Sequence, residues 1–349
     1  MRVVVVGASG NVGTSVLQSL AEEPAVQSVL GLVRRVPRWS VAKTEWATAD
    51  IATDDLVPHF QDADVVVHLA WLFQPTHDTV TTWRANALGS IRVFRAVADA
   101  GVPALVYASS VGAYSPGPQD RRVDESWPTH GWPTAGYTRE NAYVERVLDV
   151  LERDDPKRRV VRLRPGFIFK RESAVEQRRL FAGPFVPHQL VRPGLIPVVP
   201  DVPGLQFQAL HASDAGEAYR LAVVRPVRGA FNIAADPVID GPRLAELLGA
   251  KRVRVPAAVV RTAVVAAWHL HLVPASPQLL DAVLRLPLMD TTRARTELGW
   301  SPRHSAVDAV REFLEGFRSG SGMSTPPLAP ETSGRMREHE IRTGVGEKP

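Results

Sequence analysis

Residues 1–13 read MRVVVVGASGNVG, and this stretch decides the fold. Its valines predict a fully buried strand at Val3–Val6, and glycines follow at positions 7, 10 and 13 with no gap. An amphipathic helix is predicted directly afterwards, at Val12–Glu22. Glycines let the backbone turn sharply and approach a pyrophosphate, whose charge the helix amides and dipole stabilise. The stretch therefore predicts dinucleotide binding, and a merely structural glycine turn is the alternative. The residues assigned to the cofactor here are Gly7, Gly10, Asn11, Val12 and Gly13.

Apolar runs rich in valine alternate with longer helical patterns through the first half of the chain. Strands that are apolar throughout and separated by helices indicate a parallel sheet covered on both faces. The fold class is therefore α/β, a doubly wound parallel-sheet Rossmann domain. Further strands are predicted at Val29–Val33, Val65–Leu69, Leu105–Tyr107 and Val160–Leu163, and further helices at Thr81–Ala100 and Ala135–Arg153.

The composition changes after Arg164-Pro165-Gly166, where prolines become frequent and the alternation is lost. Such a segment suits an irregular lobe that caps the sheet and encloses a substrate. We expect the Rossmann domain at 1–169, with a return of the chain to it at about 205–235. A smaller, discontinuous substrate lobe is expected at 170–204 and 236–318. Residues 319–349 are rich in Gly, Ser, Pro and charge, which predicts a disordered tail. Helices are predicted at Pro242–Leu248, Pro256–Leu270, Pro277–Leu286 and Ser305–Phe317.

Composition excludes several classes of protein. A chain of 349 residues with 45% hydrophobic and 22% charged residues predicts a soluble globular protein. Its net charge of +4 comes from basic residues scattered among acidic ones, so we expect no nucleic-acid partner. With no cysteine, disulfides and thiolate metal sites are excluded. His269 and His271 are two residues apart and point to different sides of a helix, so no metal site is expected.

Arg261 interrupts the most apolar stretch, Val255–Val273, so no membrane span is expected either. The start does not resemble a secretory signal, which predicts a cytoplasmic protein.

The second predicted strand ends in Gly31-Leu-Val-Arg34-Arg35. A carboxylate that hydrogen-bonds the adenosine ribose of NAD is expected about 20 residues past the glycines, and no carboxylate is present there. A guanidinium pairs well with a 2′-phosphate, so Arg34 and Arg35 favour NADP over NAD. The alternative is that both arginines are solvated charges beside a permissive site.

The order of several short motifs resembles the extended short-chain dehydrogenase/reductase family, also called the NAD-dependent epimerase/dehydratase family. The resemblance covers residues 1 to about 316. Its motifs are Gly7-x-x-Gly10-x-x-Gly13, Asp50-Ile51, His68-Leu69-Ala70, Asn86 with Gly89, Ser109-Ser110-Val-Gly-Ala-Tyr114, Arg164-Pro165-Gly166, His211-Ala-Ser-Asp214 and Leu298-Gly299-Trp300-Ser-Pro302. For this family, the resemblance implies cofactor contacts at Asp50, Ile51, Leu69, Ala70, Trp71, Asn86, Ser109, Tyr137, Asn141, Pro165 and Gly166. It implies a structural role for His211 and Asp214.

The resemblance also implies a catalytic set of Ser110, Tyr137 and the residue one helical turn beyond the tyrosine. That residue is Asn141, where the family carries a lysine. Ser110 would hold the substrate oxygen, with Ser109 as the nearby alternative, and Tyr137 would exchange the proton. Free tyrosine has a pKa near 10, and a nearby cation favours the phenolate that proton transfer needs. Asparagine can hydrogen-bond a ribose hydroxyl but supplies no charge.

Two functions follow from this pattern. The first is an NADP- or NAD-dependent oxidoreductase or epimerase that moves hydride between nicotinamide and a carbonyl or alcohol carbon. The second is a catalytically silent cofactor-binding sensor or scaffold. The partner is a small molecule whose class stays open: a small ketone, a sterol-like molecule or a secondary metabolite. Trp127 and Trp132 are candidates for an aromatic wall beside it. By analogy with the family, a homodimer is possible.

Overall fold

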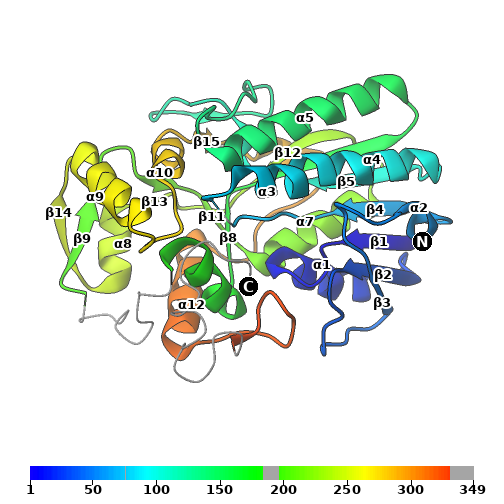
Figure 1. Ribbon diagram of the computed structural model, residues 1–349, viewed down its shortest axis with the longest axis horizontal. Helices are drawn as coiled ribbons and strands as arrows, with labels where there is room; N and C mark the ends of the chain where they lie inside the picture. Colours follow the sequence, from blue (N-terminus) through cyan, green and yellow to red (C-terminus); the bar gives the residue numbers. More distant parts are fainter. Residues whose placement is uncertain (75, 184–195, 331–349) are drawn as a thin grey trace.

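Seven parallel strands form one central sheet in the order β12-β7-β5-β4-β1-β2-β3 (Figure 1). The computed structural model describes residues 1–74, 76–183 and 196–330. Chain order reverses beside β1, which has β2 on one side and β4 on the other. A ligand of such a sheet binds at this reversal, outside the carboxyl ends of the strands. The strands are β1 (Arg2–Val6), β2 (Ser28–Val33), β3 (Thr44–Thr48), β4 (Val65–His68), β5 (Ala104–Ala108), β7 (Arg159–Pro165) and β12 (Gly229–Ile233).

Helices cover both faces of the sheet, which confirms the predicted doubly wound α/β class. Helices α1 (Asn11–Ala21) and α7 (Ala212–Val224) share a core with one face of the sheet. Helices α4 (Gly89–Asp99) and α5 (Gly136–Asp154) share a core with the other face, and both appear in the upper part of Figure 1 with α3 (Thr79–Trp83). A π-helical turn, η1 (Arg84–Leu88), joins α3 to α4, and α2 (Val57–Phe60) is a short helix that packs on α4.

Successive side chains of β1 face opposite layers, as the two-residue period of a strand requires. Val3 and Val5 lie in the core that includes residues of α1 and α7, and Val4 and Val6 lie in the core of α4 and α5. All four are essentially inaccessible to water. A strand covered on both faces is apolar at every position, which is why the valine run is a reliable signal.

Helix α7 was not predicted from the sequence. It packs against α1 so closely that a Cβ atom at Gly216 would lie 2.5 Å from the backbone oxygen of Ser15. Most of its residues are buried, because it packs against α1 and against strands β4, β5 and β7 of the sheet. A helix buried on most sides shows no amphipathic period, so its pattern was not recognised.

The remaining elements lie mainly beyond the carboxyl ends of the sheet, on the left of Figure 1. The short strands pair as β6 (Arg122–Val123) with β15 (Leu288–Met289), β8 (Phe167–Phe169) with β11 (Ala209–His211), β9 (Val198–Asp201) with β14 (Lys251–Arg254), and β10 (Gln206–Phe207) with β13 (Ile239–Asp240). The helices are η2 (Val111–Ala113), η3 (Arg171–Ser173), α6 (Ala174–Gln177), η4 (Arg178–Ala182), α8 (Gly241–Leu248), α9 (Ala257–His269), α10 (Pro277–Val283), α11 (Thr292–Thr296) and α12 (Ala306–Ser319). Within the described residues, no helix is both long and apolar enough to cross a membrane.

The predicted disordered tail is wrong for residues 319–330. Ser319 still belongs to α12, and the Leu328 side chain is fully buried. Arg179 donates hydrogen bonds to the backbone oxygens of Pro327 and Ala329. These contacts offset the entropy cost of ordering the segment, which composition alone did not reveal. The rest of the predicted tail, 331–349, lies outside the described residues.

Candidate functional site

The glycine turn after β1 is as tight as its sequence predicted. Gly7 has φ +85°, and a Cβ atom there would lie 2.7 Å from the backbone nitrogen of Ala70. At Gly13 a Cβ atom would lie 2.4 Å from the Gly7 oxygen. Both positions therefore need glycine for the fold itself: one for a left-handed turn, the other for close packing of strand against helix.

Gly10 is different, because the protein leaves room for a side chain there. Of the residues that the structure describes, only Gly7 would contact a Cβ atom at Gly10, through its backbone oxygen at an ordinary 3.6 Å, and the φ of −79° suits any residue. Gly10 is also the N-cap of α1 and has no side-chain hydrogen bond to the helix amides. Open space at an uncapped helix N-terminus fits a pyrophosphate, which uses those amides and the helix dipole.

Two buried polar atoms, Asn11 Oδ1 in this turn and Trp71 Nε1 in the loop after β4, have no hydrogen-bond partner within the described part of the chain. Both residues were assigned to the cofactor from the sequence. Buried polar atoms are nearly always satisfied, so these two fit a site completed by a ligand. Lys170, which the sequence analysis did not single out, donates to the Thr14 hydroxyl at 2.6 Å and to the Asn11 carbonyl at 2.9 Å. Its burial lowers the pKa of the Lys170 ammonium to about 8.

The residues assigned to the adenosine half lie at the carboxyl edge of β2 and β3. Arg34 and Arg35 follow β2 directly and are both exposed. The Asp50 carboxylate accepts a hydrogen bond from the Ala52 amide at 2.9 Å. Ile51 packs so closely on α4 that a Cβ atom at Gly89 would lie 2.9 Å from its side chain. This pairing explains why the sequence carries glycine at position 89.

Tyr137 and Ser110 meet across 27 residues of chain. The Tyr137 hydroxyl donates to Ser110 Oγ at 2.8 Å. Ser110 ends the loop after β5, and its Oγ also accepts the Gly112 amide at 2.9 Å, which fixes its orientation. A Cβ atom at Gly112 would lie 2.8 Å from the Tyr137 ring, so a larger residue there would displace the tyrosine. The structure thus brings together the two oxygens that the sequence assigned to the reacting group.

Asn141 lies one turn beyond Tyr137 on α5 and is almost completely buried. Its Nδ2 donates to the Tyr137 backbone oxygen at 2.9 Å. Burial raises the pKa of the Tyr137 phenol, and hydrogen bonds with Ser110 and Asn141 lower it only in part. Among the described residues, no cation contributes to that balance. Tyr137 is therefore a neutral phenol at neutral pH.

The second serine, Ser109, points to a different partner. Its hydroxyl donates to Glu145 Oε1 at 2.5 Å. Glu145 is fully buried, and Arg164 holds it through Nε and Nη2, each at 2.9 Å. Arg162 adds a third contact at 3.0 Å. Burial alone would raise the pKa of Glu145, but these partners lower it to about 2. Ser110, not Ser109, therefore faces Tyr137.

Asn86 contacts protein groups with both ends of its amide. Its Oδ1 accepts the Leu72 amide at 2.7 Å, and its Nδ2 donates to the Leu72 oxygen at 2.8 Å and to Glu140 Oε2 at 2.7 Å. Both amide hydrogens are thus used inside the protein. Burial raises the pKa of Glu140, which also accepts the Thr82 hydroxyl at 2.8 Å. Any contribution of Asn86 to cofactor binding comes through the Leu72 loop that it holds.

Glu140 and Glu145 were not predicted from the sequence, although a signal was present for Glu145. Tyr137, Asn141 and Glu145 are spaced four residues apart and so share one face of α5. A polar stripe on the inward face of a helix is unusual because each buried polar group needs a partner. The four-residue spacing of these polar side chains is therefore the sequence signal that could have identified Glu145.

The other residues assigned from the sequence have structural contacts. The Gly166 amide donates to the Ile233 oxygen, and a Cβ atom at Gly166 would lie 2.4 Å from the Gln208 oxygen. Pro165 ends β7, while Leu69 donates its amide to the Val6 oxygen at 2.9 Å. Asp214 accepts the His304 amide at 2.9 Å, which agrees with the structural role expected for it.

Neither predicted wall tryptophan stacks on Tyr137. Trp127 packs beside Val111, Tyr114 and Met289, and Trp132 lies under the Arg285 guanidinium at 4.7 Å. The rings beside Tyr137 are those of Phe73, stacked at 5.0 Å, and Trp71, edge-on at 5.9 Å. These come from the loop after β4.

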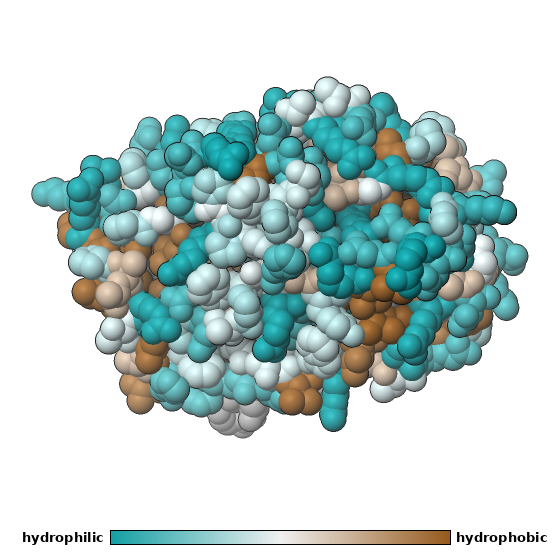
Figure 2. Space-filling model, turned by 90° about the horizontal axis from the view of Figure 1, so that it is seen from above, coloured by the Kyte–Doolittle hydropathy of each residue, from teal (hydrophilic) through white to brown (hydrophobic). Residues whose placement is uncertain are grey.

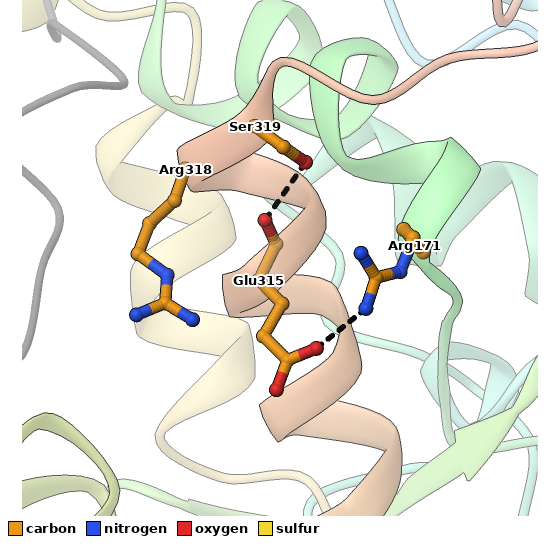
Figure 3. A pocket seen from close by; sticks show the side chains of 4 residues that line it. All are labelled: Arg171, Glu315, Arg318 and Ser319. Atoms are coloured by element: carbon orange, nitrogen blue, oxygen red, sulfur yellow. Dashed lines mark hydrogen bonds and ion pairs between the residues drawn. The ribbon is translucent and has the colours of Figure 1, made fainter.

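An open surface depression of about 480 Å³ lies at the end of α12. Its lining residues are Arg171, Glu315, Arg318 and Ser319, and Arg171 pairs with Glu315 at 2.5 Å (Figure 3). None of the residues assigned to cofactor or catalysis lines it. The candidate site is therefore the carboxyl edge of the sheet.

The fold and this edge define a doubly wound α/β protein with a glycine turn after β1 and a hydrogen-bonded tyrosine–serine pair. Residues 3–188, more than half of the chain, match the NAD dependent epimerase/dehydratase family. The chain belongs to that family, which confirms the resemblance that its motifs indicated.

The similar proteins include named enzymes. An uncharacterized protein of Mycobacterium tuberculosis is 24% identical over 331 residues, 90% of this chain and 83% of the relative. The 4-hydroxy-2-methyl-3-oxo-4-farnesyl-3,4-dihydroquinoline-1-oxide ketoreductase of Stigmatella aurantiaca is 31% identical over 173 residues, 48% of this chain and 51% of that enzyme. The crystal structure of gox2253 matches with a TM-score of 0.72 at 21% identity, covering 92% of this chain and 99% of that one. The UDP-glucose 4-epimerase of Thermus thermophilus in complex with NAD matches with a TM-score of 0.68 at 20% identity, covering 91% and 99%.

Proposed function

We propose that the protein is an NAD(P)-dependent oxidoreductase that reduces a carbonyl group of a small molecule. The observation that carries this proposal is the 2.8 Å hydrogen bond between Tyr137 and Ser110 at the sheet edge that also holds the glycine turn. Membership of the epimerase/dehydratase family supports it, as does a relative named as a ketoreductase. An epimerase would use the same residues in both directions of hydride transfer.

The bound cofactor would supply a hydride from C4 of its nicotinamide to the carbonyl carbon. The Ser110 hydroxyl hydrogen-bonds the carbonyl oxygen and polarises it, and the Tyr137 hydroxyl transfers its proton to that oxygen. The C=O double bond becomes a C–OH single bond, and the phenolate left on Tyr137 recovers a proton from water. Because burial raises the pKa of Tyr137, the phenol is protonated and ready to donate. Alcohol oxidation needs the phenolate, so the residues favour reduction at neutral pH.

For the cofactor we propose a preference for NADP over NAD, based on Arg34 and Arg35. Both guanidiniums are exposed at the end of β2, where a 2′-phosphate would lie. Several solved structures of similar fold contain NAD, so NAD is the competing cofactor. Asn141 is proposed to anchor the nicotinamide ribose through its amide.

The test is single-turnover hydride transfer from NADPH and from NADH across a panel of ketones. We expect Tyr137→Phe to lower the rate by about 100-fold or more, because general acid catalysis contributes that much. Tyr143→Phe is the matched control, since Tyr143 lies on the same helix and its side chain is 40% exposed. Equal rates for native protein and Tyr137→Phe would exclude the proposed acid.

The second candidate function is a cofactor-binding protein without catalysis. It is favoured by Asn141, because no cation among the described residues lowers the pKa of Tyr137. This candidate predicts tight binding of NADPH or NADH with no hydride transfer to any ketone. It also predicts that Asn141→Lys does not create turnover, which separates it from a weak enzyme.

We also propose a homodimer that forms through the long helices. Hydrophilic residues dominate the face seen in Figure 2, with hydrophobic residues gathered in a few places. Exposed apolar side chains at these helices include Val150 of α5 and Leu88 just before α4. Sedimentation of the native protein and of Val150→Glu tests this arrangement, which predicts a smaller species for the variant.

A further inference from the structure

Aromatic rings pack against one side of the Tyr137 ring. Phe73 stacks on its ring with an interplanar angle of 17°, and Trp71 meets it edge-on at 80°. Phe181, from η4, packs edge-on against Phe73 at 5.7 Å and is 37% exposed. This aromatic wall (Trp71, Phe73 and Phe181) combines two segments that are far apart in the sequence.

Hydrogen bonds hold the wall in place. Gln74 donates its side-chain amide to the Leu180 oxygen at 2.7 Å, which ties the Phe73 loop to η4. Leu72 lies between the two wall residues of the loop, and its backbone nitrogen donates to Asn86 while its backbone oxygen accepts from Asn86. A fixed aromatic surface beside the reacting hydroxyl is suited to a flat or apolar ligand.

A second apolar surface begins next to Ser110. A narrow cleft there has about 10 Å³ of free volume, so a ligand enters it only as side chains move apart. None of its lining residues is charged. They are Val111, Gly166, Phe167, Gln206, Phe207, Gln208, Leu286, Pro287 and Met289.

The polar side chains of this cleft already bind protein groups. Gln208 accepts the Met289 amide at 2.6 Å and donates to the Met289 oxygen at 3.1 Å. Gln206 donates to the Gln119 side chain at 2.7 Å. The cleft therefore offers a ligand mainly Phe167, Phe207 and its aliphatic residues.

A diphosphate needs cationic or amide donors, and burying it against apolar groups is costly. Among the described residues, no lysine or arginine lines the cleft, and the wall itself consists of aromatic rings. The neighbouring Arg179 of η4 donates to the backbone oxygens of Pro327 and Ala329. These surfaces suit an uncharged ligand better than a sugar nucleotide.

We propose that the substrate is an uncharged apolar ketone, either a fused-ring aromatic or an isoprenoid, whose carbonyl lies at Ser110 and Tyr137 while its apolar body occupies the wall and the cleft. The proposal rests on the proposed function, because it places the substrate oxygen on that hydrogen-bonded pair. It adds the class of substrate, which the reaction type leaves open.

The experiment measures binding apart from turnover. Full-length protein, with and without NADPH or NADH, is titrated with 1-tetralone, with geranylacetone and with UDP-glucose by calorimetry. We expect both ketones to bind at least about tenfold more tightly than UDP-glucose. Phe73→Ala should weaken ketone binding by about tenfold through loss of the stacked ring, whereas Tyr143→Ala, on the exposed side of α5, should not.

The comparison among ligands in the native protein does not depend on a variant that folds. Tighter binding of UDP-glucose, or no detectable binding of either ketone, overturns the proposed substrate class. Ketone binding weakened by Phe73→Ala supports it. If ketones bind but no hydride transfer follows with either cofactor, the substrate class stands and the proposed catalytic function fails.

Discussion

Replacing Asn141 by lysine tests how much the missing charge costs this protein. Asn141 lies one turn from Tyr137, is almost fully buried and hydrogen-bonds the tyrosine. At an effective dielectric of about 20, an ammonium about 4 Å from the phenolate would stabilise it by roughly 4 kcal/mol, or about 3 pKa units. Burying that ammonium has its own cost, so we expect the pKa of Tyr137 to fall by roughly 1–3 units.

The assay is the pH profile of alcohol oxidation, the direction that needs phenolate. Asn141→Lys should move its alkaline limb to lower pH and raise the rate at neutral pH by roughly 10- to 1000-fold. Asn141→Met is the uncharged control of similar length, and in a Tyr137→Phe background the lysine should have no effect. Thermal unfolding of each variant checks that the fold is kept. Equal rates and unshifted profiles for native protein and Asn141→Lys would refute the electrostatic argument.

Four other changes follow from the same contacts. Gly10→Ala should keep the thermal stability, because the added Cβ has an ordinary 3.6 Å contact, yet weaken cofactor binding by about tenfold or more in a fluorescence titration; unchanged affinity would mean that no ligand approaches Gly10. Arg34→Ser combined with Arg35→Ser should weaken NADPH binding more than NADH binding, and an equal loss for both would remove the argument for NADP. Glu145 has a pKa of about 2 in the folded protein against an ordinary 4.5, so its carboxylate adds on the order of 3 kcal/mol to the free energy of unfolding above pH 4.5. This contribution is lost as the pH falls toward 2. The stability gap between native protein and Glu145→Gln in urea should therefore shrink on acidification, and a gap that is constant with pH would contradict this account. Leu328→Asp should lower the free energy of unfolding by about 2–4 kcal/mol because the side chain is fully buried, whereas a neutral effect would restore the view that this segment is unstructured.

Local signals in the sequence were sufficient for most of the sheet. The strand at Val3–Val6 and the helices at Val12–Glu22 and Ala135–Arg153 agree with β1, α1 and α5 to within about two residues. The helices have a clear apolar period, whereas the strand is a short run that is apolar at every position. Glycine or proline marks the ends of these elements. Helix α7 was missed because it is buried on most sides, and the packing of Leu328 was missed because few apolar residues surround it in the sequence.

The sequence by itself determined the glycine turn and the α/β class, since each depends on residues close together in the chain, and its motifs indicated Tyr137 together with one of two neighbouring serines. Only the tertiary structure decided which serine faces Tyr137, because Ser109 and Ser110 are neighbours and only the contact with Glu145 tells them apart. It also decided that Phe73, and not the predicted tryptophans, stacks on Tyr137. Such contacts join residues distant in the chain, and no local period or spacing encodes them.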